Sequence, residues 1–302
     1  MNRYGYCCIN ITLEREGVRT NRTMRKATYE KRGLGYCSEL ALANVKDLQK
    51  IIEWNNQNGH KVFRITSNLF PWASDYELEQ LPDFEEIKSV LAECGSLARG
   101  AGQRLSFHPG PFNCLASPKE SVVQNSIRDL SIHGEVMDLM GMSNDHWSKI
   151  NIHVGASYGD REGALSTWCK NFELLPDNVK SRLTVENDDR ESLYSTKMLY
   201  DGVYKRVGVP IVFDSHHFEL GPQDQSYTEA FHTARLTWPS HIRQACHHSN
   251  SKKKYEDETC KMWSAHSDYY YTAFDSCGES VDVALESKAK ELSMIDYIDQ
   301  FV

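Results

Sequence analysis

The fold of this chain is indicated by two short apolar runs, Leu183-Thr184-Val185-Glu186 and Ile211-Val212-Phe213-Asp214, each of which ends in a carboxylate. The stretch between them, residues 195–206, has the composition of a helix, so this part of the chain predicts a strand, a helix and a second strand. The same alternation continues in both directions along the sequence. Strands are expected at residues 3–8, 61–65, 104–107, 149–152, 182–185, 210–213, 241–246 and 281–285.

Longer amphipathic stretches separate these runs. Val45, Leu48 and Ile52 belong to a stripe of helical period that Gly59 ends, and a second stripe begins near Asp83. Further helices are expected at residues 118–140, 165–172 and 292–301, and residues 252–259 are expected to form an exposed loop. Strand–helix alternation implies parallel strands joined by right-handed crossovers. The sequence therefore predicts an α/β protein with a single (β/α)₈ TIM barrel, and residues 1–302 are expected to form one domain because no Gly/Ser-rich or Pro-rich linker divides them.

Composition excludes several classes of protein. No stretch approaches the ~20 apolar residues of a membrane-spanning helix, and the first residues do not resemble a secretory signal, so no membrane partner is expected. The nine cysteines include no C-x-x-C pair, which favours reduced thiols in a cytosolic compartment. The formal net charge of −8 makes the chain as a whole a poor match for a polyanion. A nucleic-acid function would therefore need local positive charge, for which bound divalent cations are one source.

The residues that follow the expected strands are mostly histidines and carboxylates. In a barrel of this type the active site lies at the carboxyl ends of the strands, so these side chains should converge. Six strands are followed by His108, His153, Glu186, Asp214, the pair His247-His248, and Glu286. So many imidazoles and carboxylates cannot lie together unpaired, and mixed His/Asp/Glu ligation suits Mn²⁺, Zn²⁺ or Fe²⁺. Because the donors exceed what one tetrahedral ion can use, the pattern predicts a multinuclear site of the kind that hydrolyses phosphate esters.

Two adjacent histidine pairs leave a choice open. His216 and His217 both follow Asp214 closely, and His247 and His248 are neighbours. Side-chain alternation is expected to let only one member of each pair face inward. The remaining histidines lie in helix-like or connecting stretches and are expected at the surface: His60, His133, His146 and His232.

Nine short motifs, in order from residue 3 to about residue 290, resemble the UV damage endonuclease family. Two examples are Phe107-His108-Pro109-Gly110 and Glu186-Asn187-Asp188-Asp189-Arg190. The other motifs lie at residues 5–13, 20–23, 63–71, 152–155, 213–217, 265–269 and 286–290. The resemblance implies a TIM-barrel DNA repair enzyme that nicks the damaged strand immediately 5′ of a UV photoproduct and leaves a 3′-hydroxyl. It also implies three bound metal ions, typically Mn²⁺, with Zn²⁺ or another divalent cation as a substitute.

The resemblance assigns roles residue by residue. It implies that the metal ligands, which are also the catalytic residues, are His108, His153, Glu186, Asp214, His217, His247, His266 and Glu286. It thereby selects one histidine from each adjacent pair and adds His266. The residues that it implies for binding DNA around the lesion are Tyr6, Asn10, Arg64, Asn68, Pro111 and Phe112. The implied partner is UV-damaged double-stranded DNA, and the implied protein is a monomer in the cytoplasm, associated with the nucleoid in a cell.

The sequence departs from the family pattern at two places. The Gln-Tyr pair that usually follows His-Pro-Gly is replaced by Pro111-Phe112, which keeps a flat apolar side chain but loses the amide. The family lysine two residues before His247 is replaced by Ala245. These changes put the range of lesions and the completeness of the metal cluster in question, so a damage-binding protein with reduced catalysis is one alternative function.

Two further alternatives share the metal-containing barrel: an abasic-site endonuclease of the endonuclease IV type and a sugar isomerase similar to xylose isomerase. Basic residues in two expected strand–helix connections favour DNA over a small sugar. These residues are Arg22, Arg25, Lys26 and the run Lys252-Lys253-Lys254. Three divalent cations would also offset six of the eight net negative charges.

Overall fold

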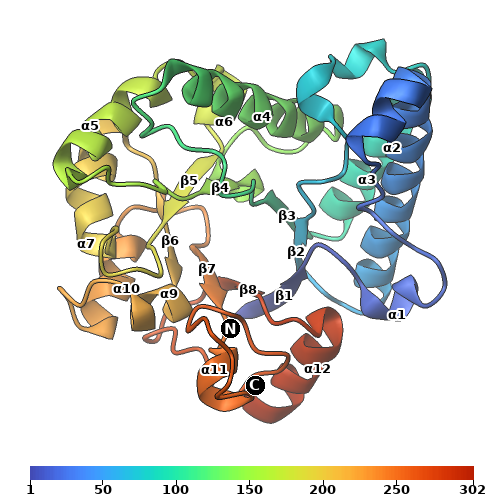
Figure 1. Ribbon diagram of the computed structural model, residues 1–302. Helices are drawn as coiled ribbons and strands as arrows, with labels where there is room; N and C mark the ends of the chain where they lie inside the picture. Colours follow the sequence, from blue (N-terminus) through green and yellow to red (C-terminus); the bar gives the residue numbers. More distant parts are fainter.

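Eight parallel strands close into a barrel in the computed structural model, which describes residues 1–302 (Figure 1). The strands are β1 (Arg3–Cys7), β2 (Val62–Ile65), β3 (Arg104–Phe107), β4 (Ile150–Ile152), β5 (Leu183–Glu186), β6 (Ile211–Asp214), β7 (Ala245–His248) and β8 (Asp282–Leu285). Neighbours in the barrel follow sequence order, and β8 returns to pair with β1. The prediction of an α/β protein with a (β/α)₈ TIM barrel is confirmed.

Helices surround the barrel and follow the strands in turn (Figure 1). They are α1 (Ile11–Glu14), α2 (Lys26–Gln57), α3 (Phe84–Gly100), α4 (Glu120–Leu139), α5 (Arg161–Phe172), α6 (Asp177–Lys180), α7 (Thr196–Leu199), α8 (Lys205–Val207), α9 (Ser215–Leu220), α10 (Tyr227–Arg235), α11 (Lys252–Tyr255) and α12 (Lys290–Phe301). Short 3₁₀ turns are η1 (Ala73–Asp75), η2 (Leu78–Gln80) and η3 (His146–Ser148), and η4 (Tyr200–Tyr204) is a π-helical turn between α7 and α8. None of these helices has the length and hydropathy that crossing a bilayer requires.

The structure corrects three local expectations. Strand β7 begins at Ala245 and not at residue 241, because Ile242 packs against Trp238 in a small apolar cluster outside the strand. Part of the expected loop at residues 252–259 is the short helix α11, whose charged residues carry no apolar pattern. His133 is buried and not at the surface, and its Nδ1 lies 2.7 Å from the carbonyl oxygen of Asp129.

The strands separate apolar and polar side chains. Leu183 and Val185 of β5 belong to a continuous apolar core that includes side chains from all eight strands. Successive side chains of a strand point to opposite faces, so Thr184 and Glu186 point into the barrel. Thr184 donates a hydrogen bond there to Asn151 of β4, and Asn151 donates one to Glu186. The barrel interior is thus polar, and it leads to the carboxyl ends of the strands.

The opposite end of the barrel is held together by one carboxylate. Asp282, at the start of β8, accepts hydrogen bonds from Arg3 at 2.6 and 2.7 Å. It also accepts from Arg104 of β3 and from Arg243, which precedes β7, both at 3.1 Å. Asp282 and Arg104 are each 1% exposed. This buried ion-pair cluster joins strands that are far apart in the sequence.

Replacing Asp282 with asparagine should lower the free energy of unfolding by about 3–5 kcal/mol, because it leaves the buried Arg104 charge without its partner. Urea denaturation measures this change. The control is Asp201→Asn, since Asp201 pairs with Lys197 and Lys205 at the surface and is 43% exposed. Its loss should stay below about 1 kcal/mol. Equal losses in the two variants would contradict the role given to Asp282.

Candidate metal centre

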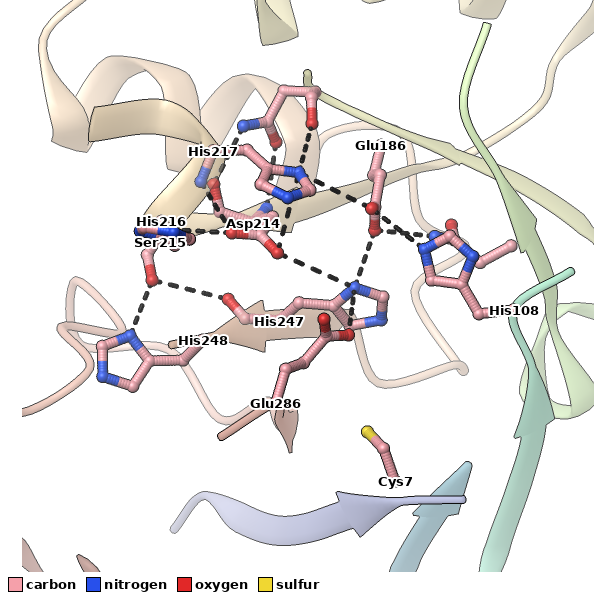
Figure 2. Close-up of polar contacts among 12 residues, drawn as sticks. Cys7, His108, Glu186, Asp214, Ser215, His216, His217, His247, His248 and Glu286 are labelled. Carbon is pink, nitrogen blue, oxygen red and sulfur yellow. Dashed lines mark hydrogen bonds and ion pairs between the residues drawn. The ribbon is translucent and has the colours of Figure 1, made fainter. Parts of the chain in front are cut away.

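The carboxylate of Glu186, at the end of β5, lies close to nitrogens of three imidazole rings. Figure 2 shows two of these rings, those of His108 and His247, on either side of it. Its Oε1 is 3.0 Å from Nε2 of His108 and 2.7 Å from Nε2 of His153. Its Oε2 is 2.7 Å from Nδ1 of His247 and accepts a hydrogen bond of 2.7 Å from Asn151. Glu186 is 1% exposed. Donor atoms from β3, β4, β5 and β7 therefore meet at one buried carboxylate.

Asp214, at the end of β6, holds a second part of the site. Its Oδ1 accepts the backbone N–H groups of His216 and His217 at 2.8 and 2.9 Å and so caps α9. Its Oδ2 is buried and has no hydrogen-bond partner. Nδ1 of His217 lies 3.8 Å from this oxygen and 3.6 Å from Oε1 of Glu186. His217 is thereby placed between the two carboxylates.

Glu286, directly after β8, closes the arrangement. Its Oε1 is 3.2 Å from Nδ1 of His247 and pairs with the guanidinium of Arg64 from β2. Burial alone would raise the pKa of Glu286, but Arg64, His247 and His266 lower the pKa below its usual range. Glu286 is therefore ionised at neutral pH and available as a ligand.

Three overlapping sets of donor atoms fit divalent cations. Within each set the donor atoms lie within 4.8 Å of one another. The sets are His108, His153 and Glu186; Glu186, Asp214 and His217; and Asp214, His247 and Glu286. A buried oxygen without a hydrogen-bond partner, such as Asp214 Oδ2, is costly unless a further group binds it. The donor set thus fits Mn²⁺, Zn²⁺ or Fe²⁺.

The protonation states of His108 and Glu186 agree with this fit. Burial alone would lower the pKa of His153 and His217, but the nearby carboxylates outweigh it and raise both. Burial lowers the pKa of His108 to about 4, against the opposing effect of Glu186, so its ring is neutral at pH 7. Burial alone would raise the pKa of Glu186, but His108, His247 and His153 lower it well below its usual range. A neutral imidazole and an ionised carboxylate are the forms that bind metal ions.

His266 reaches the same region from the connection between β7 and β8. An antiparallel bridge to Ser251 fixes its backbone. Burial lowers the pKa of its ring to about 4, although the nearby Glu286 and Asp214 carboxylates oppose the shift. Its Nδ1 has no hydrogen-bond partner. His266 follows no strand, so only the family motif could indicate it.

The adjacent histidine pairs differ from each other. His247 and His248 lie on β7, where alternation turns His247 into the barrel and His248 away from it. His248 is bonded elsewhere, with Nδ1 2.7 Å from Ser215 Oγ and Nε2 3.0 Å from the Thr272 carbonyl oxygen. His216 and His217 lie in the first turn of α9, where strand alternation does not apply.

The residues expected to bind the lesion fall into two groups, and the first borders an open cavity of about 720 Å³ beside His108. Asn68 and Phe112 line this cavity, and Phe112 is 89% exposed. Pro111 is exposed next to Phe112. An exposed aromatic side chain therefore stands beside the candidate metal centre.

The second group is buried. Tyr6 is 0% exposed and donates a hydrogen bond of 2.7 Å to Asn55 of α2, and Asn10 donates one of 2.8 Å to the Tyr6 hydroxyl. Arg64 is bound to Glu286. The neighbour of Tyr6, Cys7, points from β1 toward the cluster (Figure 2). In this conformation Tyr6 and Asn10 hold the turn after β1 and do not line the cavity.

Three polar residues of the site escaped the sequence reasoning. Asn151 contacts Glu186, and Oδ1 of Asp188 lies 3.0 Å from Nδ1 of His153. Nζ of Lys149 is buried 3.1 Å from Nε2 of His247, and burial lowers its pKa to about 7. A buried lysine thus contacts His247 from the direction of β4 although Ala245 replaces the family lysine. Side-chain alternation could have indicated Lys149 and Asn151, since residues 149, 151 and 153 point to the same face of the strand.

A model of the family described as UV-endonuclease UvdE matches residues 2–301. The chain belongs to this family. The UV-damage endonuclease of Schizosaccharomyces pombe is 34% identical over 305 residues, which cover 97% of this chain and 50% of the relative. The UV DNA damage endonuclease of Clostridium perfringens is 31% identical over 303 residues, covering 98% of this chain and 70% of the relative. This UvdE-family chain therefore spans half the length of the yeast protein.

The fold of this UvdE-family chain agrees with a solved structure. The crystal structure of SacUVDE superposes with a TM-score of 0.84 at 29% sequence identity, covering 99% of this chain and 97% of that chain. The agreement covers nearly the whole chain, including the strands at whose carboxyl ends most of the candidate ligands lie.

Asp188→Asn should weaken metal binding about 10- to 100-fold, because a carboxylate that orients a ligating histidine typically contributes this much to affinity. Titration of the metal-free protein with Mn²⁺ in a calorimeter measures the change. Asp189→Asn is the matched control, since the Asp189 carboxylate lies 3.8 Å from Arg190 at the surface. Unchanged affinity in Asp188→Asn, or equal weakening in both variants, would show that Asp188 does not orient His153.

Proposed function

We propose that residues 1–302 act as a single metal-dependent DNA repair endonuclease domain that nicks duplex DNA immediately 5′ of UV photoproducts and leaves a 3′-hydroxyl. The observation that carries the proposal is the placement of Glu186 among His108, His153 and His247, next to the cavity bordered by Phe112. Membership of the UvdE family supports the same activity. UV-damaged double-stranded DNA is the proposed substrate, and the proposed protein is a cytoplasmic monomer, associated with the nucleoid in a cell.

The proposed cofactor is Mn²⁺, with three ions held by the eight family ligands and with Zn²⁺ or another divalent cation able to replace it. Bound divalent cations supply Lewis-acid chemistry, which activates water and stabilises negative charge on a phosphate. The protein contributes a fixed frame: Asn151 holds Glu186, Asp188 lies against His153, and Arg64 neutralises part of the charge of Glu286. These contacts fix the donor atoms before the substrate binds.

The surroundings of the centre suit a distorted duplex. Phe112 offers a flat, exposed ring that can stack on an unpaired base, and Asn68 borders the same cavity. In the connection after β7, Nζ of Lys253 lies 5.2 Å from the ring centroid of Trp263, which is 55% exposed. A cationic group beside an exposed aromatic ring is a suitable contact for a phosphate backbone and its bases. Extrusion of bases is easiest where damage has already weakened pairing.

One end-labelled duplex with a single thymine dimer tests the activity. The Mn²⁺-loaded protein should nick immediately 5′ of the dimer, and His153→Ala and Glu186→Ala should each abolish nicking and lower the bound metal while the circular dichroism spectrum stays unchanged. Full nicking by either variant would contradict the assignment. A matched duplex with one abasic site tests for an abasic-site endonuclease, because an enzyme of the endonuclease IV type would cut only there. Tight binding of the dimer duplex without a nick would indicate a damage-binding protein.

Phe112→Ala should lower the ratio of affinities for damaged over undamaged duplex about 5- to 150-fold, which corresponds to the ~1–3 kcal/mol of one base–aromatic stack. Fluorescence anisotropy with both duplexes in Ca²⁺ measures the ratio without cleavage. Leu236→Ala is the control, because Leu236 is 69% exposed and follows α10, on the side of the barrel away from the candidate site. An unchanged ratio in Phe112→Ala would remove Phe112 from lesion recognition.

A further inference from the structure

The connection between α1 and α2, together with the first turns of α2, is rich in positive charge. Residues 15–32, called the basic segment below, contain seven arginines or lysines and two glutamates. The segment therefore has a net charge of +5, whereas the whole chain has a net charge of −8. Each of these basic residues except Arg22 is exposed. The basic segment thus carries the local positive charge that an acidic chain needs to bind a polyanion.

Much of this charge is not neutralised by the protein. The ion pairs of the basic segment leave the side chains of Arg15, Arg25 and Lys31 free. Lys26 pairs with Glu30 at 3.9 Å, but these side chains are 73% and 64% exposed, so the pair contributes little. The basic segment can therefore offer several cations to a partner without breaking a strong contact.

The other run of basic residues, Lys252-Lys253-Lys254, differs in this respect. Nζ of Lys252 lies 3.2 Å from Asp268 and 3.9 Å from Glu256. Nζ of Lys254 lies 3.8 Å from Glu219. Acidic side chains thus pair with two of these three lysines, and the surplus of positive charge lies in the basic segment.

The backbone of the basic segment is fixed by two buried residues of α2, Asn44 and Asp47. The Arg19 N–H donates to Oδ2 of Asp47 at 2.9 Å, and the Arg22 N–H donates to Oδ1 of Asn44 at 3.0 Å. Nδ2 of Asn44 donates in return to the Arg22 carbonyl oxygen at 3.1 Å. A connection held in this way loses little conformational entropy when it binds a partner.

Contacts at two points place the basic segment beside the open cavity of the candidate site. The Thr20 hydroxyl donates a hydrogen bond of 3.1 Å to the carbonyl oxygen of Cys8, which lines this cavity. The ring of Tyr29 stacks on that of Trp72 with centroids 5.3 Å apart. Trp72 directly precedes η1, which lines the same cavity. A duplex with its lesion at the cavity would therefore pass close to the basic segment.

We propose that the basic segment binds the sugar–phosphate backbone of the duplex beside the lesion and supplies affinity that does not depend on damage. Free cations distributed along the segment suit a polymer of phosphates better than a single small anion. Phosphate contacts position a protein on DNA but carry no information about the bases. The inference rests on the proposed function and divides recognition into two parts, with the basic segment providing affinity and Phe112 providing discrimination.

The double variant Arg25→Gln/Lys31→Gln tests this division with the dimer-containing duplex and the same duplex without damage. Fluorescence anisotropy in Ca²⁺ at several NaCl concentrations measures both affinities. The variant should bind both duplexes more weakly by one common factor, so the ratio of affinities should keep its wild-type value. The slope of log K against log salt should become less steep by about 2, because each phosphate contact contributes about 0.9.

The matched control is Lys88→Gln/Lys170→Gln, which removes the same charge from exposed positions on α3 and α5. This control should keep the wild-type affinity and salt slope. Wild-type affinity and slope in Arg25→Gln/Lys31→Gln, or equal weakening in the control, would overturn the proposal. A lowered ratio of affinities would contradict its independence from damage. If the wild-type protein bound neither duplex, the proposed function would fail as well, so the two failures are distinguishable.

Discussion

The contact between the buried Glu186 carboxylate and three imidazoles is the interaction on which the rest of the site depends. A carboxylate that is 1% exposed is costly in a protein interior unless charge or hydrogen bonds compensate it. His108, His153 and His247 come from three different strands, so they reach Glu186 only when the barrel is closed. The geometry of the site therefore depends on the correct pairing of the strands in the barrel.

The barrel has a cluster of polar side chains at each end. At one end Asp282 ties together arginines from distant strands, and at the other end carboxylates and histidines gather around Glu186. Inside the barrel, Thr184 donates a hydrogen bond to Asn151, and Asn151 donates one to Glu186. The apolar core lies outside the strands, where the helices cover it. Rigid strands thus hold the donor atoms, and the loops carry the exposed side chains such as Phe112.

The sequence predicted the barrel and most of the site because both depend on local pattern. Alternating apolar runs located the eight strands, and the residues that follow them located Glu186 and Asp214. The contact of Lys149 with His247 was missed, because alternation places Lys149 on the same face as His153 but does not show which histidine of another strand it reaches. The same limit affects Tyr6, whose hydroxyl is bonded to a helix residue far along the chain. The residues alone left the choice between His216 and His217 open, because both lie in a helical turn where strand alternation does not apply.

The central claim is that the cluster around Glu186 exists to bind divalent cations. Diffraction data collected at the manganese absorption edge from crystals of the Mn²⁺-loaded protein test it most directly. The account predicts anomalous density peaks in contact with the Glu186 carboxylate and with the imidazoles of His108, His153 and His247. Absence of any such peak, with these side chains bonded only to one another, would contradict the account.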